Sequence, residues 1–375
     1  MSKYFIDIHV LQSMPPSNVN RDDAGRPKTA VFGGTTRARV SSQSWKRAVR
    51  RAFEGLIADD ERAVRTLRAV EVLTPMIQDR RPEWSLEQSR NRAITVLEKT
   101  GIKLEIPKAK QKEGEEPKPA TSQYLLFLSV HQLNRLADLA AAGDDPITAR
   151  EAKESVGGNH GIEVSLFGRM VADATDLKVD SSVQVAHALS THAVDVESDF
   201  FTAVDDYKEV GDDAGAGMIG YVDFDSSTLY RFATVDLSKL SESLGSADVA
   251  AKAASAFVEG FAMAMPTGKQ NTFANNTVPE VLLVQLRKGR SASLVNAFET
   301  AVPRSETGFL RPSAEALAQH CQDLEQSFLG KADASYLTRS SERASALDAI
   351  AEPRPLRELV AAIEAASIEA LGAKS

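Results

Sequence analysis

The chain has 375 residues, of which 43% are hydrophobic and 26% charged, and its formal net charge is −8. This balance is typical of a soluble globular protein with two or three domain-sized units, and the pI of about 5.5 argues against indiscriminate binding to nucleic acid. The single cysteine excludes an intramolecular disulfide and a cysteine-based zinc site. No segment has the ~20 apolar residues needed to cross a membrane, and the N-terminus is too briefly apolar for a signal peptide, so we expect a cytoplasmic protein without a membrane partner.

The N-terminal segment predicts a strand, a polar loop and a basic helix. Residues 4–11 alternate between two faces, which indicates a half-buried strand with Asp7 and His9 on its polar side. From Ser42 the pattern becomes helical, because Trp45, Val49 and Phe53 recur at every fourth position. The opposite side of this helix is basic and carries Lys46, Arg47, Arg50 and Arg51.

Residues 59–159 are predicted to form a helical insertion after that first unit. One helix is expected over 85–100, with Ser85 and Gln88 at capping-box spacing, and another over 129–141. Between them, residues 108–120 are rich in Lys, Glu and Pro and show no apolar period, which predicts an exposed loop.

The core is predicted to resume late in the chain. Strands over 229–237 and 281–286 flank a long helix over 246–265, and the tail shows amphipathic helices over 314–328 and 356–371. This order is compatible with an α+β fold of the ferredoxin-like or RNA-recognition-motif type. Such a sheet needs one further strand, which the sequence does not place.

Residues 21–51 form a basic stretch within an acidic protein. Nine basic and two acidic side chains give it a charge of +7, which leaves −15 for the rest of the chain. One surface is therefore expected to contact a polyanion. The aromatic signature with which RNA-recognition motifs stack bases does not occur, so the predicted contact is with backbone phosphates. The basic residues are Arg21, Arg26, Lys28, Arg37, Arg39, Lys46, Arg47, Arg50 and Arg51.

Three other groupings are considered as sites. His187 and His192 are five residues apart and would not share a helix face, which favours ordinary hydrogen-bonded histidines over a metal site. Residues 267–272 lack the first glycine and the Ser/Thr of a phosphate loop. The pairs at 22–23 and 205–206 are aspartates that could hold Mg²⁺, although basic neighbours favour salt bridges for the first pair. We expect neither a metal nor another cofactor.

Eight blocks spread over most of the chain match the pattern of a known family. They are residues 21–23, 32–34, 39–51, 165–170, 183–206, 229–237, 268–274 and 293–302. In these blocks the chain resembles the CasC family, the repeated backbone subunits of Cascade, which is the type I-E CRISPR RNA-guided surveillance complex. The 108–120 loop and the C-terminal tail lie outside the resemblance.

The resemblance implies a non-catalytic scaffold that polymerises along the spacer of a CRISPR guide RNA. The guide would stay open for pairing with target DNA, and the partners would be neighbouring copies and other Cascade subunits. Joined to the predicted elements, it implies an RNA-recognition-motif palm over 1–58 and 160–300, helical fingers over 59–159, a β-hairpin thumb over 195–226 and a C-terminal helical region over 301–375. The glycine-rich segment 212–221 suits the tip of the thumb.

The resemblance also assigns roles to individual positions. Guide phosphates would be held by Ser41, Gln43, Lys46 and Arg50, with Arg21 and Arg47 as further candidates, and by Lys269 from the loop after the long helix. Met170 would lie beside a kinked base, and Phe200, Phe201 and Thr202 at the base of the thumb. From the residues alone, a core position is the better explanation for the two phenylalanines.

Two other functions stay open. Related backbone subunits of type III CRISPR complexes cut target RNA with an aspartate in the loop after the first strand, and Asp22 and Asp23 lie in such a loop. A metal-dependent RNase subunit is therefore the alternative. A monomeric RNA-binding regulator is a third possibility, but it would need base-reading aromatic residues that the sequence does not show.

Overall fold

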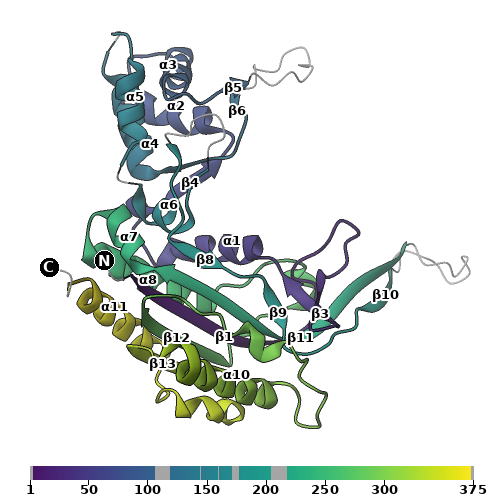
Figure 1. Ribbon diagram of the computed structural model, residues 1–375. Coiled ribbons are helices and arrows are strands. Elements are labelled where there is room, and N and C mark those ends of the chain that lie inside the picture. The colour runs from purple at the N-terminus through teal and green to yellow at the C-terminus, as the bar shows by residue number, and fades with distance from the viewer. Residues whose placement is uncertain are drawn as a thin grey trace, which may run out of the picture. The chain divides into compact units, whose positions relative to one another are not determined.

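The fold mixes helices and strands in two compact units. The computed structural model describes residues 3–105, 119–143, 145–158, 160–170, 177–203 and 218–372 (Figure 1). The first unit, here called the sheet unit, comprises Met1–Ala52, Gln184–Thr234 and Phe257–Ala366. The second, the helical unit, comprises Phe53–Val183, Val235–Ala256 and Ser367–Ser375. The predicted α+β class is confirmed, and no helix of the described ranges is long and apolar enough to span a membrane.

A large antiparallel sheet forms the basis of the sheet unit. Its strand order is β13-β12-β1-β11-β9-β3-β2, and β8 and β10 pair with β11 outside this path. The strands are β1 (Tyr4–Ser17), β2 (Thr29–Phe32), β3 (Thr35–Val40), β8 (Val183–Val185), β9 (Ala188–Ser190), β10 (Glu197–Ala203), β11 (Met218–Asp236), β12 (Val281–Lys288) and β13 (Ala334–Arg339). The strands predicted over 4–11, 229–237 and 281–286 are thus confirmed as parts of β1, β11 and β12.

Five strands of this sheet were not predicted: β2, β3, β8, β9 and β13. The further strand that the sequence left unplaced is β9, which pairs with β11 and β3 and is too short to show an alternating pattern. In the tail, where only helices were expected, β13 pairs with β12 at the edge of the sheet. Of its residues only Leu337 is buried, so its apolar pattern is faint.

The helices predicted for the tail are confirmed as α10 (Leu310–Leu324) and α11 (Leu356–Gly372). A π-helical turn, η5 (Glu325–Leu329), continues α10. The other short elements are η1 (Phe53–Gly55), η2 (Asp59–Glu61), α9 (Gln270–Phe273), η4 (Val295–Phe298) and η6 (Glu342–Ala349).

The central strand β1 is buried on both faces, although the sequence predicted burial on one. Ile6 on one face and Asp7 and His9 on the other have no exposed surface. The second face is covered because α10 packs against it in an apolar cluster that includes Tyr230. The His9 ring bonds the Tyr230 hydroxyl at 2.9 Å, and burial lowers the pKa of His9 to about 3. His9 is therefore neutral at physiological pH.

Two helices, α1 (Ser42–Ala52) and the C-terminal part of α8 (Ala247–Met263), pack on the face opposite α10. Neighbouring residues of a strand point to opposite faces, and Tyr230 of β11 lies in the α10 cluster. Arg231 therefore points the other way, where its guanidinium lies over the rings of Trp45 in α1 and Phe261 in α8. The predicted basic helix and long helix are confirmed.

Arg231 is a fully buried arginine that joins these elements. Its guanidinium carbon lies 3.8 Å from the Trp45 ring centroid and 4.6 Å from that of Phe261. One amino group donates to the Gln12 side-chain oxygen at 2.6 Å and the other to the carbonyl of Phe261 in the last turn of α8. Burial lowers the pKa of Arg231 to about 9, so the group still carries its charge at pH 7.

The helical unit has an apolar core of its own. It contains α2 (Ala69–Arg80), α3 (Leu86–Lys99), α4 (Val130–Ala141), α5 (Ala149–Val156), α6 (Gly161–Phe167) and α7 (Leu237–Leu244), with the strand pairs β4 (Ala63–Thr66)–β7 (Leu126–Ser129) and β5 (Leu104–Glu105)–β6 (Thr121–Ser122). The helices predicted over 85–100 and 129–141 are confirmed, and Ser85 and Gln88 form the expected capping box. Most of the predicted exposed loop over 108–120, namely residues 108–118, lies outside the described residues.

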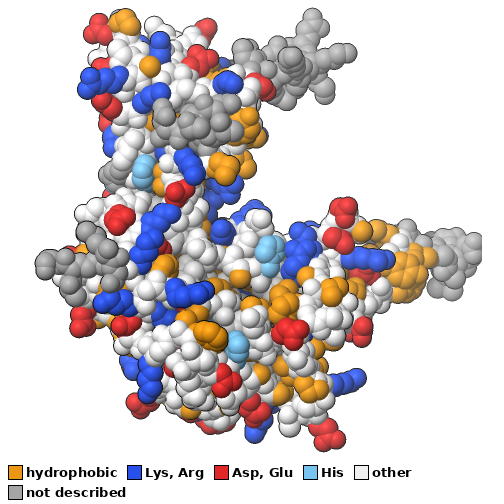
Figure 2. Space-filling view, viewed as in Figure 1, with side chains coloured by type: hydrophobic (Ala, Val, Ile, Leu, Met, Phe, Trp, Pro, Cys, Tyr) orange, Lys and Arg blue, Asp and Glu red, His pale blue; other side chains and the backbone are white. Residues whose placement is uncertain are grey.

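A β-hairpin is formed by β10 and the first part of β11. The register runs from Glu197 opposite Phe224 to Ala203 opposite Met218, and apolar side chains reach the surface here (Figure 2). The rings of Phe200 and Tyr221 lie 5.4 Å apart and are 53% and 70% exposed. The predicted glycine-rich tip falls largely on residues 204–217, outside the described residues.

Replacing Arg231 tests how α1 is held on the sheet. Arg231→Ala should lower the free energy of unfolding of the sheet unit by about 2–5 kcal/mol, because it leaves a large cavity between two rings. Arg231→Met should cost less, since it keeps most of the volume and removes a buried charge. The chain has two tryptophans, so urea unfolding followed by fluorescence in a Trp84→Phe background reports on Trp45 alone. Equal losses in both variants would show that the guanidinium hydrogen bonds dominate instead.

Candidate nucleic-acid interface

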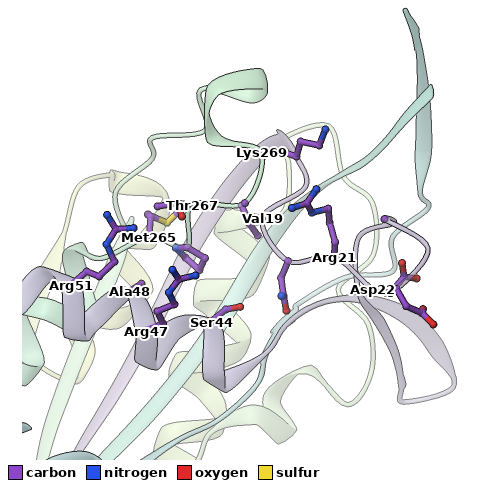
Figure 3. Close-up of a pocket in the computed structure, with 15 residues that line it drawn as sticks. Val19, Arg21, Asp22, Ser44, Arg47, Ala48, Arg51, Met265, Thr267 and Lys269 are labelled. Carbon is purple, nitrogen blue, oxygen red and sulfur yellow. The ribbon is translucent and has the colours of Figure 1, made fainter. Parts of the chain in front are cut away.

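A cleft in the sheet unit is lined by three segments of the chain, two from its N-terminal part and one that follows much later in the sequence. Its volume is about 680 Å³, and its walls are α1, the loop after β1 (residues 19–25) and the loop after α8 (residues 265–269), as Figure 3 shows. Four cationic side chains line it: Arg21, Arg47, Arg51 and Lys269. Asp22 and Asp23 line the same cleft. This composition suits a polyanion with phosphates spaced along a chain.

Helix α1 places two of these arginines by its periodicity. Arg47 and Arg51 are four residues apart, so their side chains lie on the same face of the helix, and both are exposed. On the opposite side Trp45 and Val49 are completely buried against the sheet unit's core. The buried stripe therefore fixes the direction in which the basic face points.

The loop after α8 reaches the cleft because a glycine allows a close approach. A Cβ atom on Gly268 would lie 2.3 Å from the carbonyl oxygen of Val19, so any larger residue would push the two loops apart. Lys269 follows with φ 49°, a left-handed conformation that is uncommon for a residue other than glycine. This turn places the Lys269 side chain at the cleft.

The loop after β1 is ordered by its own hydrogen bonds. The Asp22 N–H donates to the Arg26 carbonyl at 2.9 Å, and the Arg26 N–H donates to the Asp22 carboxylate at 2.9 Å. The Asn20 side-chain oxygen accepts from the N–H of Ser41 at 2.9 Å, which ties this loop to the start of α1. Arg21 is exposed next to this anchor.

The structure brings some of the predicted phosphate ligands together and not others. Arg21, Arg47 and Lys269 line the cleft. Ser41 is largely buried at the start of α1, where its hydroxyl lies 3.4 Å from that of Ser44. Gln43 is exposed on α1, and Lys46 and Arg50 are half-buried there, but none of these three lines the cleft.

The other predicted contacts lie elsewhere. Phe200, Phe201 and Thr202 are exposed on β10 of the hairpin. Met170 belongs to the helical unit and is 81% exposed. Its neighbour Arg169 is buried and donates to the Leu177 carbonyl at 2.7 Å, which holds this turn in place.

The nine basic residues counted over 21–51 overstated the positive charge that can contact a ligand. Arg37 is completely buried and donates to the carbonyls of Ser190 and Phe298 at 3.0 and 2.9 Å, so it stabilises the fold. Arg26 is paired with Asp223 at 3.2 Å. Conversely, Arg51 was not among the predicted ligands but lines the cleft. Its spacing of four residues from Arg47 was the signal that could have identified it.

The other groupings have structural explanations. His192 accepts the Thr228 N–H at 3.1 Å and bonds the Ala193 carbonyl, and His187 lies 3.2 Å from Arg39, so both are hydrogen-bonded histidines. Among the described residues, no three His, Cys, Asp or Glu side chains gather in a way that could hold a metal ion. The second aspartate pair, at 205–206, lies outside the described residues.

Comparison with known proteins identifies the family. The model of a Cas family, described as CT1975-like protein, matches residues 6–362. The chain belongs to this family. The resemblance to CasC proteins predicted from the sequence is thereby confirmed. No curated protein matches the chain.

Two solved structures are similar to this chain over nearly its whole length. One, described as a CRISPR RNA-guided surveillance complex, pre-nicking, has a TM-score of 0.83 and 34% identity, with 97% of this chain and 100% of that chain covered. The other, described as a CRISPR RNA-guided surveillance complex, has a TM-score of 0.72 and 29% identity, with coverages of 96% and 99%. Both units of the chain therefore have counterparts in these structures.

A buried carboxyl group lies at the root of the hairpin. Asp225 of β11 is 8% exposed and lines a small cavity together with Asn20, Lys28 and Arg39. Burial raises the pKa of Asp225 to about 6, because the charged form is poorly solvated there. The folded state consequently holds this proton more tightly than the unfolded chain does.

Replacing Asp225 by Asn should therefore stabilise the sheet unit in a pH-dependent way. A folded-state pKa above the unfolded value means that the aspartate lowers stability as pH rises from about 4 to about 6. Asp225→Asn should gain about 1–3 kcal/mol at pH 7 and less than about 1 kcal/mol at pH 4. Urea unfolding at both pH values measures this, with the exposed Asp195→Asn as the control. A gain that is equal at both pH values would contradict the assignment.

Proposed function

We propose that the protein is a non-catalytic, guide-RNA-binding backbone subunit of a type I-E Cascade surveillance complex. The observation that carries the proposal is the cleft in which Arg21, Arg47, Arg51 and Lys269 come together. Several copies would polymerise along the spacer of a guide RNA in the cytoplasm. They would bind other Cascade subunits and present the guide for pairing with target DNA.

The strand order supports assigning the sheet unit as a palm of RNA-recognition-motif type. A ferredoxin-like sheet has the order 4-1-3-2 with two helices on one face. The strands β12, β1, β11 and β9 lie side by side in that order, and α1 and α8 pack on one face through Trp45 and Phe261. In this assignment the helical unit supplies the fingers, and the β10–β11 hairpin is the thumb.

The composition of the cleft supports recognition of the RNA backbone without base reading. Among the described residues that line it, none is aromatic, whereas base recognition in RNA commonly relies on stacking. Arginine and lysine contacts to phosphate position a strand and leave its base edges free. A scaffold that must accept any spacer sequence requires this kind of contact.

The exposed apolar hairpin supports a role in contacting the guide and a neighbouring copy. Phe200, Met218, Ile219 and Tyr221 are between 53% and 70% exposed. A two-stranded hairpin has no core of its own that could bury such side chains. In a polymer, the guide strand and the neighbouring subunit would cover them.

Purification from the native host at low salt, followed by sequencing of the bound RNA, tests the whole proposal. We expect repeat-derived RNAs of uniform length, together with partner proteins in a fixed ratio. Varied cellular transcripts, or a monomer without RNA, would refute it.

Removing the two cleft arginines of α1 tests the phosphate contacts. Arg47→Ala with Arg51→Ala should weaken binding of single-stranded RNA of every sequence alike. The slope of log affinity against log salt should fall by about 0.7 for each lost contact. The control is Arg311→Ala, an exposed arginine on α10 of the same unit. A loss that depends on the RNA sequence would contradict backbone recognition.

Incubation of the assembled complex with complementary RNA and Mg²⁺ tests the rival RNase function. We expect the RNA to stay intact, because the Asp22 carboxylate is used to close its own loop. Cleavage that disappears in an Asp22→Asn, Asp23→Asn variant would establish the RNase alternative.

A further inference from the structure

One buried amide joins the cleft to the hairpin. Asn18 is 1% exposed, and its side-chain N–H groups donate to two carbonyls, Gly25 at 3.0 Å and Asp223 at 2.8 Å. Gly25 lines the cleft, in the loop after β1. Asp223 lies in β11, opposite Ser198 at the root of the hairpin. Two segments that are about two hundred residues apart in the sequence are thus held by the same group.

A second contact connects the same two segments. The Arg26 guanidinium lies 3.2 Å from the Asp223 carboxylate. That carboxylate also accepts the hydroxyl of Ser198 at 2.5 Å, so it links the loop to both strands of the hairpin. The pair is partly exposed and adds to the Asn18 contacts without replacing them.

The unpaired side-chain oxygen of Asn18 indicates that the residue is present for the bonds that its amide nitrogen donates. Its side-chain oxygen is buried and has no hydrogen-bond partner among the described residues. An unpaired buried acceptor costs free energy. An apolar residue would avoid that cost, so the position is explained by the two bonds that the amide donates.

Asn20 on the same loop has a different partner. Its side-chain oxygen accepts the Ser41 N–H, which connects the loop to α1. The loop is therefore anchored to the helix through Asn20 and to the hairpin through Asn18. The two asparagines form a matched pair for experiment.

We propose that Asn18 is a positioning residue that couples the cleft to the hairpin, so that the loop after β1 and the hairpin root move as one body. The consequence for RNA rests on the proposed function: a phosphate held by Arg21 would fix the place of this loop. The loop would in turn fix where Phe200 and Phe201 meet the guide.

Hydrogen exchange of the full-length protein without RNA tests the coupling. Asn18→Ala should speed exchange of amides 197–199 and 222–225 by about tenfold, since it removes the hydrogen bond to the Asp223 carbonyl that ties this root to the loop. Asn20→Ala should speed exchange in the loop and at the start of α1 while leaving the hairpin root unchanged. Amides of β1 and β12 report that each variant is folded.

Each outcome decides the question. Unchanged exchange at the root in Asn18→Ala, or an equal rise in both variants, would overturn the proposal. If Asn18→Ala does not fold, Arg26→Ala replaces it, because that side chain is 68% exposed. Arg26→Ala should speed exchange at the same amides by a smaller factor, and no change would again overturn the coupling. Binding of oligouridylate to the native protein is measured separately, so a failure of the proposed function is distinguishable from a failure of the coupling.

Discussion

The placement of Arg231 between two aromatic rings is the interaction on which the cleft depends. Its guanidinium packs on Trp45 of α1 and Phe261 of α8 and also donates to the last turn of α8. Burying a charge is costly, and cation–π contacts and charge-assisted hydrogen bonds offset part of that cost. Because α1 carries Arg47 and Arg51 while the chain leaving α8 carries Lys269, this one group sets the distance between two walls of the cleft.

The positions of the charged side chains, more than the net charge, determine where this protein can contact an anionic ligand. A net charge of −8 would repel RNA from most of the surface. Within the basic stretch, Arg37 is buried in the core and Arg26 is paired with Asp223. Only part of the positive charge of this stretch can therefore contact a ligand. The arginines that remain at the cleft are held on a helix and an anchored loop, so little backbone entropy would be lost on binding a strand, and the cost falls on their exposed side chains.

The parts of this fold that could be predicted are those with a strong local pattern. The basic helix followed from the spacing of Trp45 and Val49, and its cationic face followed with it. The strand β9 could not be predicted because three residues show no period, and the second buried face of β1 depends on tail elements that are distant in sequence. The role of Lys269 as a phosphate contact was predicted only from the family resemblance. The role of Asn18 could not be predicted from the sequence, because its hydrogen-bond partners are backbone carbonyls, which every residue has.

The hairpin shows how a rigid scaffold can present an adaptable surface. Its root is held by polar contacts of Asn18 and Asp223, while towards the tip the exposed side chains are apolar and include Phe200 and Tyr221. Polar anchors are directional and fix where the hairpin begins, whereas apolar side chains tolerate several partners because burial depends little on geometry. In the proposed role, a subunit that binds guides of any sequence would benefit from this division, since the contact can vary while its position along the strand stays fixed.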